Sequence, residues 1–232
     1  MRNFLLLIIL LASWWPSPGR AQPTRDTTVQ RGASAPGFAA FAAERSRLDR
    51  GGMGVLGGWA VGNLLVSGIA TGRTEGSAHY FHQMNIGWGA VNLALAGAGY
   101  LGARREARQP AAGRADNVRA QLRTENLYLF NAGLDVAYLA VGAYLLEKSR
   151  NPTASGSPDR WRGYGQSLLL QGGFLLLFDG LQYSRHHRHG NRDLYPLLSR
   201  VSIGPGNFAL TLPLGRGNRT AHFPATRAGL QP

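Results

Sequence analysis

The sequence contains no cysteine, and its acidic residues are few beside its basic ones. Without cysteine the chain has no disulfide, no thiolate metal site, no cysteine nucleophile and no lipid anchor on cysteine. It also lacks a recognisable set of nucleophile, base and orienting group. These absences argue against an enzyme, and they leave no cofactor and no metal to expect.

Lys and Arg number 25 against 12 Asp and Glu, a formal net charge of +13. Such a balance is typical of proteins that bind nucleic acid or an anionic surface. The sequence has no zinc-finger spacing, no RNP-like run and no basic stripe with interleaved aromatics. Its arginines cluster at the ends of apolar segments, where they can contact lipid headgroups. We therefore expect the lipid bilayer, and no nucleic acid, as a partner.

Lysine and arginine are missing from four apolar segments, each long enough to cross a bilayer. They predict spans at about residues 53–71, 80–102, 127–146 and 163–183. The 32 glycines also suit helices that pack closely within a membrane. The predicted fold class is an all-α membrane protein with a four-transmembrane-helix bundle over residues 51–185.

The two ends of the chain differ from this middle part. Residues 1–21 predict a cleavable signal peptide, because Arg2 precedes an apolar stretch and small residues precede the cut. An uncleaved anchor is the alternative. Residues 22–50 predict a polar arm and an interfacial amphipathic helix. Residues 186–232 form a basic tail, in which alternating apolar residues around a Gly-Pro-Gly-Asn turn predict a β-hairpin at 200–214.

Polar residues inside the spans are the candidate functional residues. In the second span they recur at spacings of three and four, so they share one helix face that lipid would penalise. We expect such faces to point into the bundle and to form a polar cluster that serves as a ligand or proton site. Its members are Asn63, His82, Asn85, Asn92, Asn131, Asp135, Gln171 and Asp179.

Asp135 is the most unusual of these residues, because a carboxylate near mid-membrane has no lysine or arginine in any span to pair with. Asn63, Asn92 and Gln171 lie near the middle of their own spans and are expected at the same depth. The cluster then acts either as interhelical glue or as a functional proton or ligand site. A catalytic pair of His82 with Asp179 is disfavoured, because the two lie near opposite ends of the bundle.

Small residues predict where helices approach closely. Gly54, Gly58 and Gly62 recur every four residues in the first span, and Gly89 and Gly99 continue the polar stripe of the second. Both patterns are typical of helix packing in membranes. The histidines at 186, 187 and 189 are not expected to bind metal, because neighbours point to different faces and interleaved arginines repel a cation.

Four segments carry a resemblance to a known family: GMGVLGGWAVGN (52–63), YFHQMNIGWGAVN (80–92), NAGLDVAYLAVGAYL (131–145) and RGYGQSLLLQGGFLLLFD (162–179). Together they resemble a family of uncharacterised bacterial four-helix integral membrane proteins, over roughly residues 40–185. The resemblance implies a multi-pass membrane protein of the bacterial envelope. It implies no activity, substrate or site residue.

Two sequence rules disagree on the orientation of the spans. A cleaved signal places the N-terminal arm and the tail outside the cytoplasm, whereas most Lys and Arg lie on the arm, tail and middle connection, which favours the opposite. We follow the signal. The leading functional hypothesis is a non-enzymatic bundle that binds itself as a homo-oligomer or another membrane protein. A proton-coupled carrier built on Asp135 and a membrane enzyme built on His82 are the alternatives.

Overall fold

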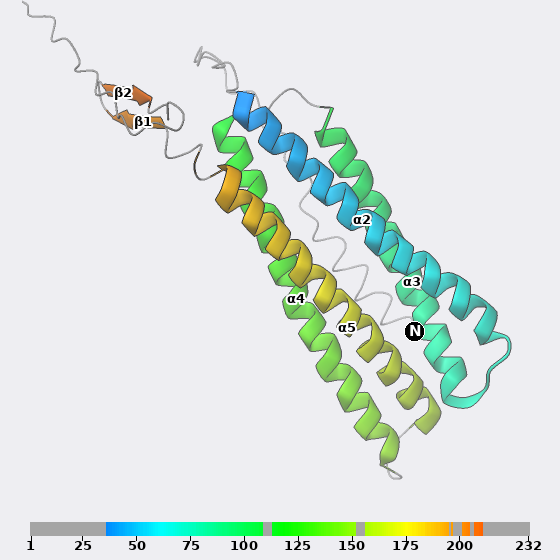
Figure 1. Cartoon of the computed structure of the whole chain (residues 1–232). Coiled ribbons are helices and arrows are strands. Elements are labelled where there is room, and N and C mark those ends of the chain that lie inside the picture. Colours follow the sequence, from blue (N-terminus) through cyan, green and yellow to red (C-terminus); the bar gives the residue numbers. More distant parts are fainter. Residues whose placement is uncertain are drawn as a thin grey trace, which may run out of the picture. The chain divides into compact units, whose positions relative to one another are not determined.

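The computed structural model describes residues 36–108, 113–151, 156–194, 196, 201–204 and 207–210, so the predicted signal peptide lies outside the described residues. The four helices of the described part are α2 (Pro36–Thr71), α3 (Gly76–Glu106), α4 (Arg114–Arg150) and α5 (Pro158–His189) (Figure 1). A π-helical turn, η1 (Gly190–Leu194), follows α5. Strands β1 (Val201–Gly204) and β2 (Asn207–Leu210) pair antiparallel, with Val201 opposite Leu210. The predicted helical bundle is confirmed.

Local sequence explains where the helices begin and end. The chain turns at residues 72–75, and Gly76 opens α3 with a φ of 54°, which favours glycine. Gly156 has a φ of 101° just before α5, and Pro158 then occupies the first turn, where its missing N–H costs nothing. Lys148 and Arg150 lie in the last turn of α4, where a positive charge complements the helix dipole.

The N-terminal part of α2 departs from the sequence prediction. Residues 38–50 do not form a separate interfacial helix, because α2 runs without a break from Pro36 to Thr71. Phe38 and Phe41 are buried against Leu194 of η1. Gly52 lets this part of α2 lie close to α5, since a Cβ there would be 2.8 Å from the side-chain Cδ of Gln182. Burial of the two phenylalanines therefore stabilises the N-terminal part of α2 against η1.

The helices form two antiparallel pairs, α2 with α3 and α4 with α5, joined mainly through α5 (Figure 1). Helix α5 packs against α4, α3 and α2, so it occupies the centre of the bundle. It approaches α4 closely at Gly165, where a Cβ would meet the carbonyl oxygen of Gly142 at 2.8 Å. Small residues thus set the spacing of the central helix from its neighbours.

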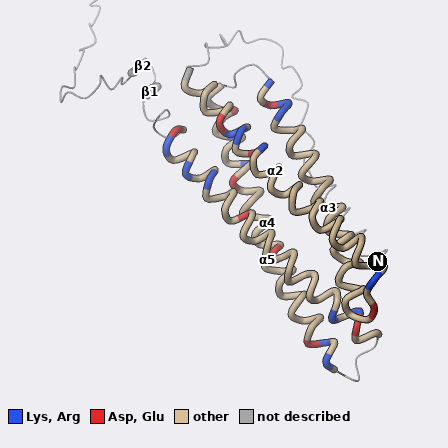
Figure 2. The backbone as a smooth tube through the Cα atoms, turned by 45° about the vertical axis from the view of Figure 1, so that its right-hand side comes forward, with Lys and Arg blue, Asp and Glu red and all other residues tan. Residues whose placement is uncertain are grey.

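Several polar side chains are buried between the helices and several large apolar side chains are exposed, the reverse of what a water-soluble bundle shows. Asn85, Asp135 and Gln171 are buried, whereas Val66, Leu177 and Leu181 are each at least 64% exposed. Lys and Arg gather at the ends of the helices, and the middle of each helix is largely uncharged (Figure 2). By length and composition, two helices of the described part could cross a membrane, α2 over Gly37–Thr71 and α4 over Ala115–Arg150.

Candidate functional site

A group of hydrogen-bonded polar side chains joins α2, α3 and α5 in the bundle interior. We call it the amide cluster; it comprises Trp59, Asn63, Asn85, Ser167 and Gln171. The amide nitrogen of Gln171 donates to Asn63 Oδ1 at 2.9 Å and to Asn85 Oδ1 at 2.7 Å. Gln171 Oε1 accepts from Trp59 Nε1 at 2.9 Å, and Ser167 Oγ donates to Asn85 at 2.9 Å. Gln171 therefore bonds to both other helices through a single side chain.

The amide cluster has the properties expected of hydrogen bonds that hold neighbouring helices together. Gln171 is fully buried and both ends of its amide are satisfied, which offsets the cost of removing it from water or headgroups. Trp59 stacks on Phe174 of α5 with ring centroids 4.0 Å apart. The cluster has no titratable side chain. Its geometry supports helix association and leaves no free group for chemistry.

The two aspartates of the spans meet elsewhere, at the interface of α4 and α5. Asp135 and Asp179 are 2% and 4% exposed, and their side chains are in hydrogen-bonding contact with each other. Asn131 also reaches Asp179, while Asp135 Oδ2 has no partner in the described part of the chain. A hydrogen bond between two carboxyl groups requires a proton on one of them. We refer to Asp135 and Asp179 as the carboxyl pair.

The remaining candidate residues lie apart from both groups. Asn92 of α3 is 2% exposed, and its Nδ2 has no hydrogen-bond partner among the described residues. His82 lies near the start of α3, where its Nδ1 is 3.2 Å from Ser67 Oγ on α2. Of the residues expected at one depth, Asn63 and Gln171 are hydrogen-bonded, with Asn85 added. Asp135 lies level with Gly172, whose Cβ would be 3.2 Å from the Asp135 carbonyl oxygen, but its side chain belongs to the carboxyl pair.

The glycines divide into two groups. Gly89 and Gly99 lie where α3 meets α2; a Cβ on Gly89 would be 2.9 Å from Leu64 Cγ, and one on Gly99 would be 2.9 Å from Met53 Cγ. Gly54, Gly58 and Gly62 are exposed, and no atom lies within 4 Å of a Cβ placed on them. The ridge on α2 therefore faces away from the rest of the bundle.

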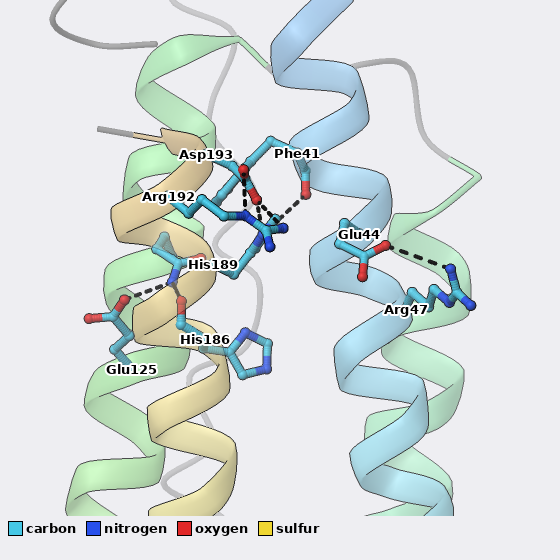
Figure 3. A network of polar contacts seen from close by, with 9 residues as sticks. Phe41, Glu44, Arg47, Glu125, His186, His189, Arg192 and Asp193 are labelled. Atoms are coloured by element: carbon cyan, nitrogen blue, oxygen red, sulfur yellow. Dashed lines mark hydrogen bonds and ion pairs between the residues drawn. The ribbon is translucent and has the colours of Figure 1, made fainter. Parts of the chain in front are cut away.

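Sequence reasoning missed a second polar centre at the end of the bundle where α2 begins and α5 ends. We call it the histidine end; its members are Asp49, Glu125, His186, His187, His189 and Asp193. His186 Nε2 lies 3.1 Å from Asp49 Oδ1, and His187 Nδ1 lies 3.3 Å from Glu125 Oε2. The ring of His186 points from α5 toward α2, and His189 lies between Asp193 and the Phe41 carbonyl (Figure 3).

Burial at the histidine end is deeper than a solvated basic flank would allow. His186 is fully buried and His189 is 5% exposed. Hydrogen bonding from Arg192 lowers the pKa of the Asp193 carboxyl, which keeps it ionised beside His189. The pairings of His186 with Asp49 and of His187 with Glu125 were not visible in sequence, because they depend on which helices flank α5. His189 and Asp193 are four residues apart, a local spacing that the sequence does show. Within the described part of the chain, no group of three acidic or histidine side chains could hold a metal ion.

No catalytic constellation is apparent in these residues. His82 has Ser67 as its hydrogen-bonding neighbour and no carboxylate to orient it in the contacts above. A shallow depression of about 510 Å³ lies nearby and is lined by Ser77, Ala78, Phe81 and Gln166, none of which titrates near neutral pH. The arrangement can bind protons at the carboxyl pair and can associate helices at the amide cluster.

Comparison with known families gives one match, over residues 55–180, more than half of the chain. The chain belongs to DUF6992, a family of unknown function. The match extends from α2 to α5 and includes every member of the amide cluster and both residues of the carboxyl pair. Most of the histidine end lies outside it. No curated protein and no solved structure matches this DUF6992 member.

Proposed function

We propose that this DUF6992 member is a multi-pass integral membrane protein in which all four helices cross the bilayer. The inverted polarity carries the proposal: Gln171 and Asn85 are buried, while Leu177 is 70% and Leu181 is 65% exposed. Soluble monomers rarely expose large contiguous apolar surfaces, whereas lipid requires them. An apolar exterior around a hydrogen-bonded polar interior is what a bilayer would select.

Helices α3 and α5 belong in the membrane although their composition alone is too polar to mark them as spans. Each carries an interior face of amides, glycines and carboxyls that lowers its average hydropathy. A composition window averages this buried face with the lipid-facing one, although lipid contacts only the latter. Both helices are also long enough, since a span needs about 20 residues, and they have 31 and 32.

The proposed location is the bacterial cell membrane, with the N-terminal arm and the tail on the non-cytoplasmic side. The export signal predicted at residues 1–21 supports this orientation, and the positive charge of the arm and the tail opposes it. With four spans, the turn between α2 and α3 and the connection between α4 and α5 then face the cytoplasm. The α3–α4 connection faces outward.

Single cysteines test this topology, because the natural chain has none to interfere. In intact cells we expect a membrane-impermeant maleimide to label Gly113→Cys and to spare Arg73→Cys and Glu147→Cys until the cells are opened. Leu177→Cys, on the exposed face of α5, should stay unlabelled in both conditions because lipid covers it. Labelling of Leu177→Cys in a detergent-free extract would show a water-soluble bundle. Labelling of Arg73→Cys from outside would reverse the orientation.

The role that the geometry favours for this bundle is non-enzymatic. The interior amides satisfy one another, and among the described residues the hydrogen-bonding contact of His82 is Ser67 and not the acid that orients a catalytic histidine. The outward ridge of Gly54, Gly58 and Gly62 offers a surface for a second copy or another membrane protein. We therefore propose a structural or partner-binding bundle in the envelope.

A second candidate function is proton binding at the carboxyl pair. It rests on the contact between Asp135 and Asp179, because two carboxylates sharing one site cannot both ionise without a cation. No lysine or arginine occurs in the predicted spans to neutralise them. The pair would hold one proton at neutral pH and could release it in exchange for a conformational change or a transported ion.

The proton bound by the carboxyl pair should be detectable by infrared spectroscopy. In purified protein at neutral pH we expect the infrared carbonyl band of a protonated carboxylic acid, which disappears when both Asp135→Asn and Asp179→Asn are introduced. Asp116→Asn is the matched control, because Asp116 is an exposed acid on α4, outside the carboxyl pair. A wild-type spectrum without the band would rule out the proton-binding function and leave the structural one.

A further inference from the structure

We propose that the histidine end of the bundle binds the headgroups of anionic phospholipids through five exposed arginines. We call them the unpaired arginines; they are Arg104, Arg105, Arg108, Arg119 and Arg188. The inference rests on the proposed membrane location and adds the class of lipid that the protein selects there. Three observations support it: the arginines share one end of the bundle, the acids around them are engaged elsewhere, and their depth matches that of headgroups.

Contacts between the helices place the unpaired arginines at one end of the bundle. Arg45 of α2 pairs with Glu106 of α3 and donates to the carbonyl oxygen of Asn117 on α4 at 3.4 Å. His186 of α5 lies 3.1 Å from Asp49 of α2. The end of α3, the start of α4 and the end of α5 therefore lie together around the N-terminal part of α2, where Figure 2 shows several basic residues.

Most acidic side chains at this end are already engaged by bases of the chain itself. The pairs are Glu44 with Arg47, Asp49 with His186, Glu106 with Arg45, Glu125 with His187, and Asp193 with His189 and Arg192. Asp116 is the exposed acid of this end that has no side-chain partner in the described part of the chain. None of the unpaired arginines has a side-chain hydrogen bond or ion pair with another described residue. Five exposed positive charges therefore face one unengaged acid.

The opposite end of the bundle carries no such surplus. Among its described residues, the exposed charges without a side-chain partner are two arginines and two acids, Arg73, Arg162, Glu75 and Asp159. The other bases there contact an acid or an aromatic ring: Arg150 with Glu147 at 3.2 Å, and Lys148 and Arg160 over the ring of Trp161. Unengaged charges therefore cancel at this end and accumulate at the histidine end.

The unpaired arginines also lie at the depth expected of headgroup contacts. Leu101 of α3, Leu122 of α4 and Leu181 of α5 are exposed, and lipid would cover them. The sequence separations from these leucines are three and four residues for Arg104 and Arg105, three for Arg119 and seven for Arg188. Such spacings keep each arginine on the same helix face as its leucine. They also carry it about 5 to 10 Å further along the helix, out of the hydrocarbon and toward the layer of phosphate groups.

Anionic headgroups fit this surface better than other occupants do. A guanidinium stays charged and can donate two parallel hydrogen bonds to a phosphate. The residues after Asp193 contain no Asp or Glu, so the tail cannot neutralise the arginines, and a second copy of the bundle would present the same positive charge. Surplus positive charge favours a phosphate that has no choline or amine beside it, which is the headgroup of phosphatidylglycerol.

Lipid selectivity of the reconstituted full-length protein tests the inference. In phosphatidylcholine bilayers, electron paramagnetic resonance measures the fraction of a spin-labelled lipid whose motion the protein restricts. We expect spin-labelled phosphatidylglycerol to associate about fivefold more strongly than spin-labelled phosphatidylcholine, the effect of one basic residue near an anionic surface. The preference should vanish in about 1 M salt, where charges are screened within about 3 Å.

Two variants that remove equal charge locate the binding surface. Arg104→Gln combined with Arg188→Gln should reduce the preference to about twofold, because each removes a charge of about that influence on lipid. Arg73→Gln combined with Arg162→Gln is the matched control at the opposite end and should keep the wild-type preference. Equal association of the two lipids with the wild type, an unchanged preference in the first variant, or the same loss in both variants would each overturn the inference. A protein that restricts neither lipid would instead overturn the membrane location.

Discussion

Replacement of Gly163 by alanine is expected to destabilise the bundle by about 3 kcal/mol, at the upper end of the usual cost of overpacking. A Cβ at this position would collide with the backbone carbonyl of Ser77 and would lie 2.7 Å from the backbone nitrogen of Phe81. Both obstacles are backbone atoms within helix α3, so no side-chain rotation can relieve them. The added methyl group must push α5 away from α3.

The same substitution at Gly173 is the matched control for Gly163→Ala. Gly173 belongs to the same helix, and no atom lies within 4 Å of a Cβ placed there. Gly173→Ala should therefore leave stability unchanged or raise it by about 0.5 kcal/mol through lower backbone entropy. The midpoint of unfolding by SDS in mixed micelles compares the two. Equal midpoints for both variants would show that α3 and α5 do not approach at Gly163.

Helices and their inward polar faces were predictable from sequence, because both follow from local periodicity. The spacing of Asn85, Gly89 and Asn92 fixes one face of α3, and all three residues are buried as expected. The helices extend beyond the predicted spans: α2 begins at Pro36 and α5 ends at His189. Apolar composition marks a membrane-crossing stretch, while burial against neighbouring helices decides how far the helix continues.

Pairings between helices were not predictable, because they depend on how far one helix is shifted along another. Asp135 was expected at the depth of Gln171, and a Cβ on the adjacent Gly172 would lie 3.2 Å from the Asp135 carbonyl oxygen. The contact of the Asp135 side chain with Asp179 was not foreseen, because it depends on how α4 and α5 pack. His186 and His187 looked like part of a solvated basic flank for the same reason, since their carboxylate partners come from α2 and α4. The ridge of Gly54, Gly58 and Gly62 was expected to pack against a helix, yet no described atom lies within 4 Å of a Cβ placed on these residues, because small-residue spacing does not say which neighbour faces it.

Replacement of Gln171 by leucine is the second change with a large expected effect. It removes three hydrogen bonds and leaves the Trp59 N–H and the Asn63 oxygen without their partner. Hydrogen bonds between membrane helices contribute about 0.6 kcal/mol each on average, so we expect a loss of about 2 kcal/mol. Leucine is close to glutamine in volume, and the loss therefore reports the hydrogen bonds and not a cavity.

Gln166→Leu provides the control, because Gln166 is an exposed residue of the same helix. This substitution makes the same chemical change outside the amide cluster. It should leave the SDS midpoint unchanged. If Gln171→Leu proved as stable as Gln166→Leu, the amides would not hold α2 and α3 to α5, and the structural role of the cluster would be wrong. A clear loss at Gln171 alone would show that the bundle depends on a polar interior, as a membrane setting requires, because lipid supplies no hydrophobic force between helices.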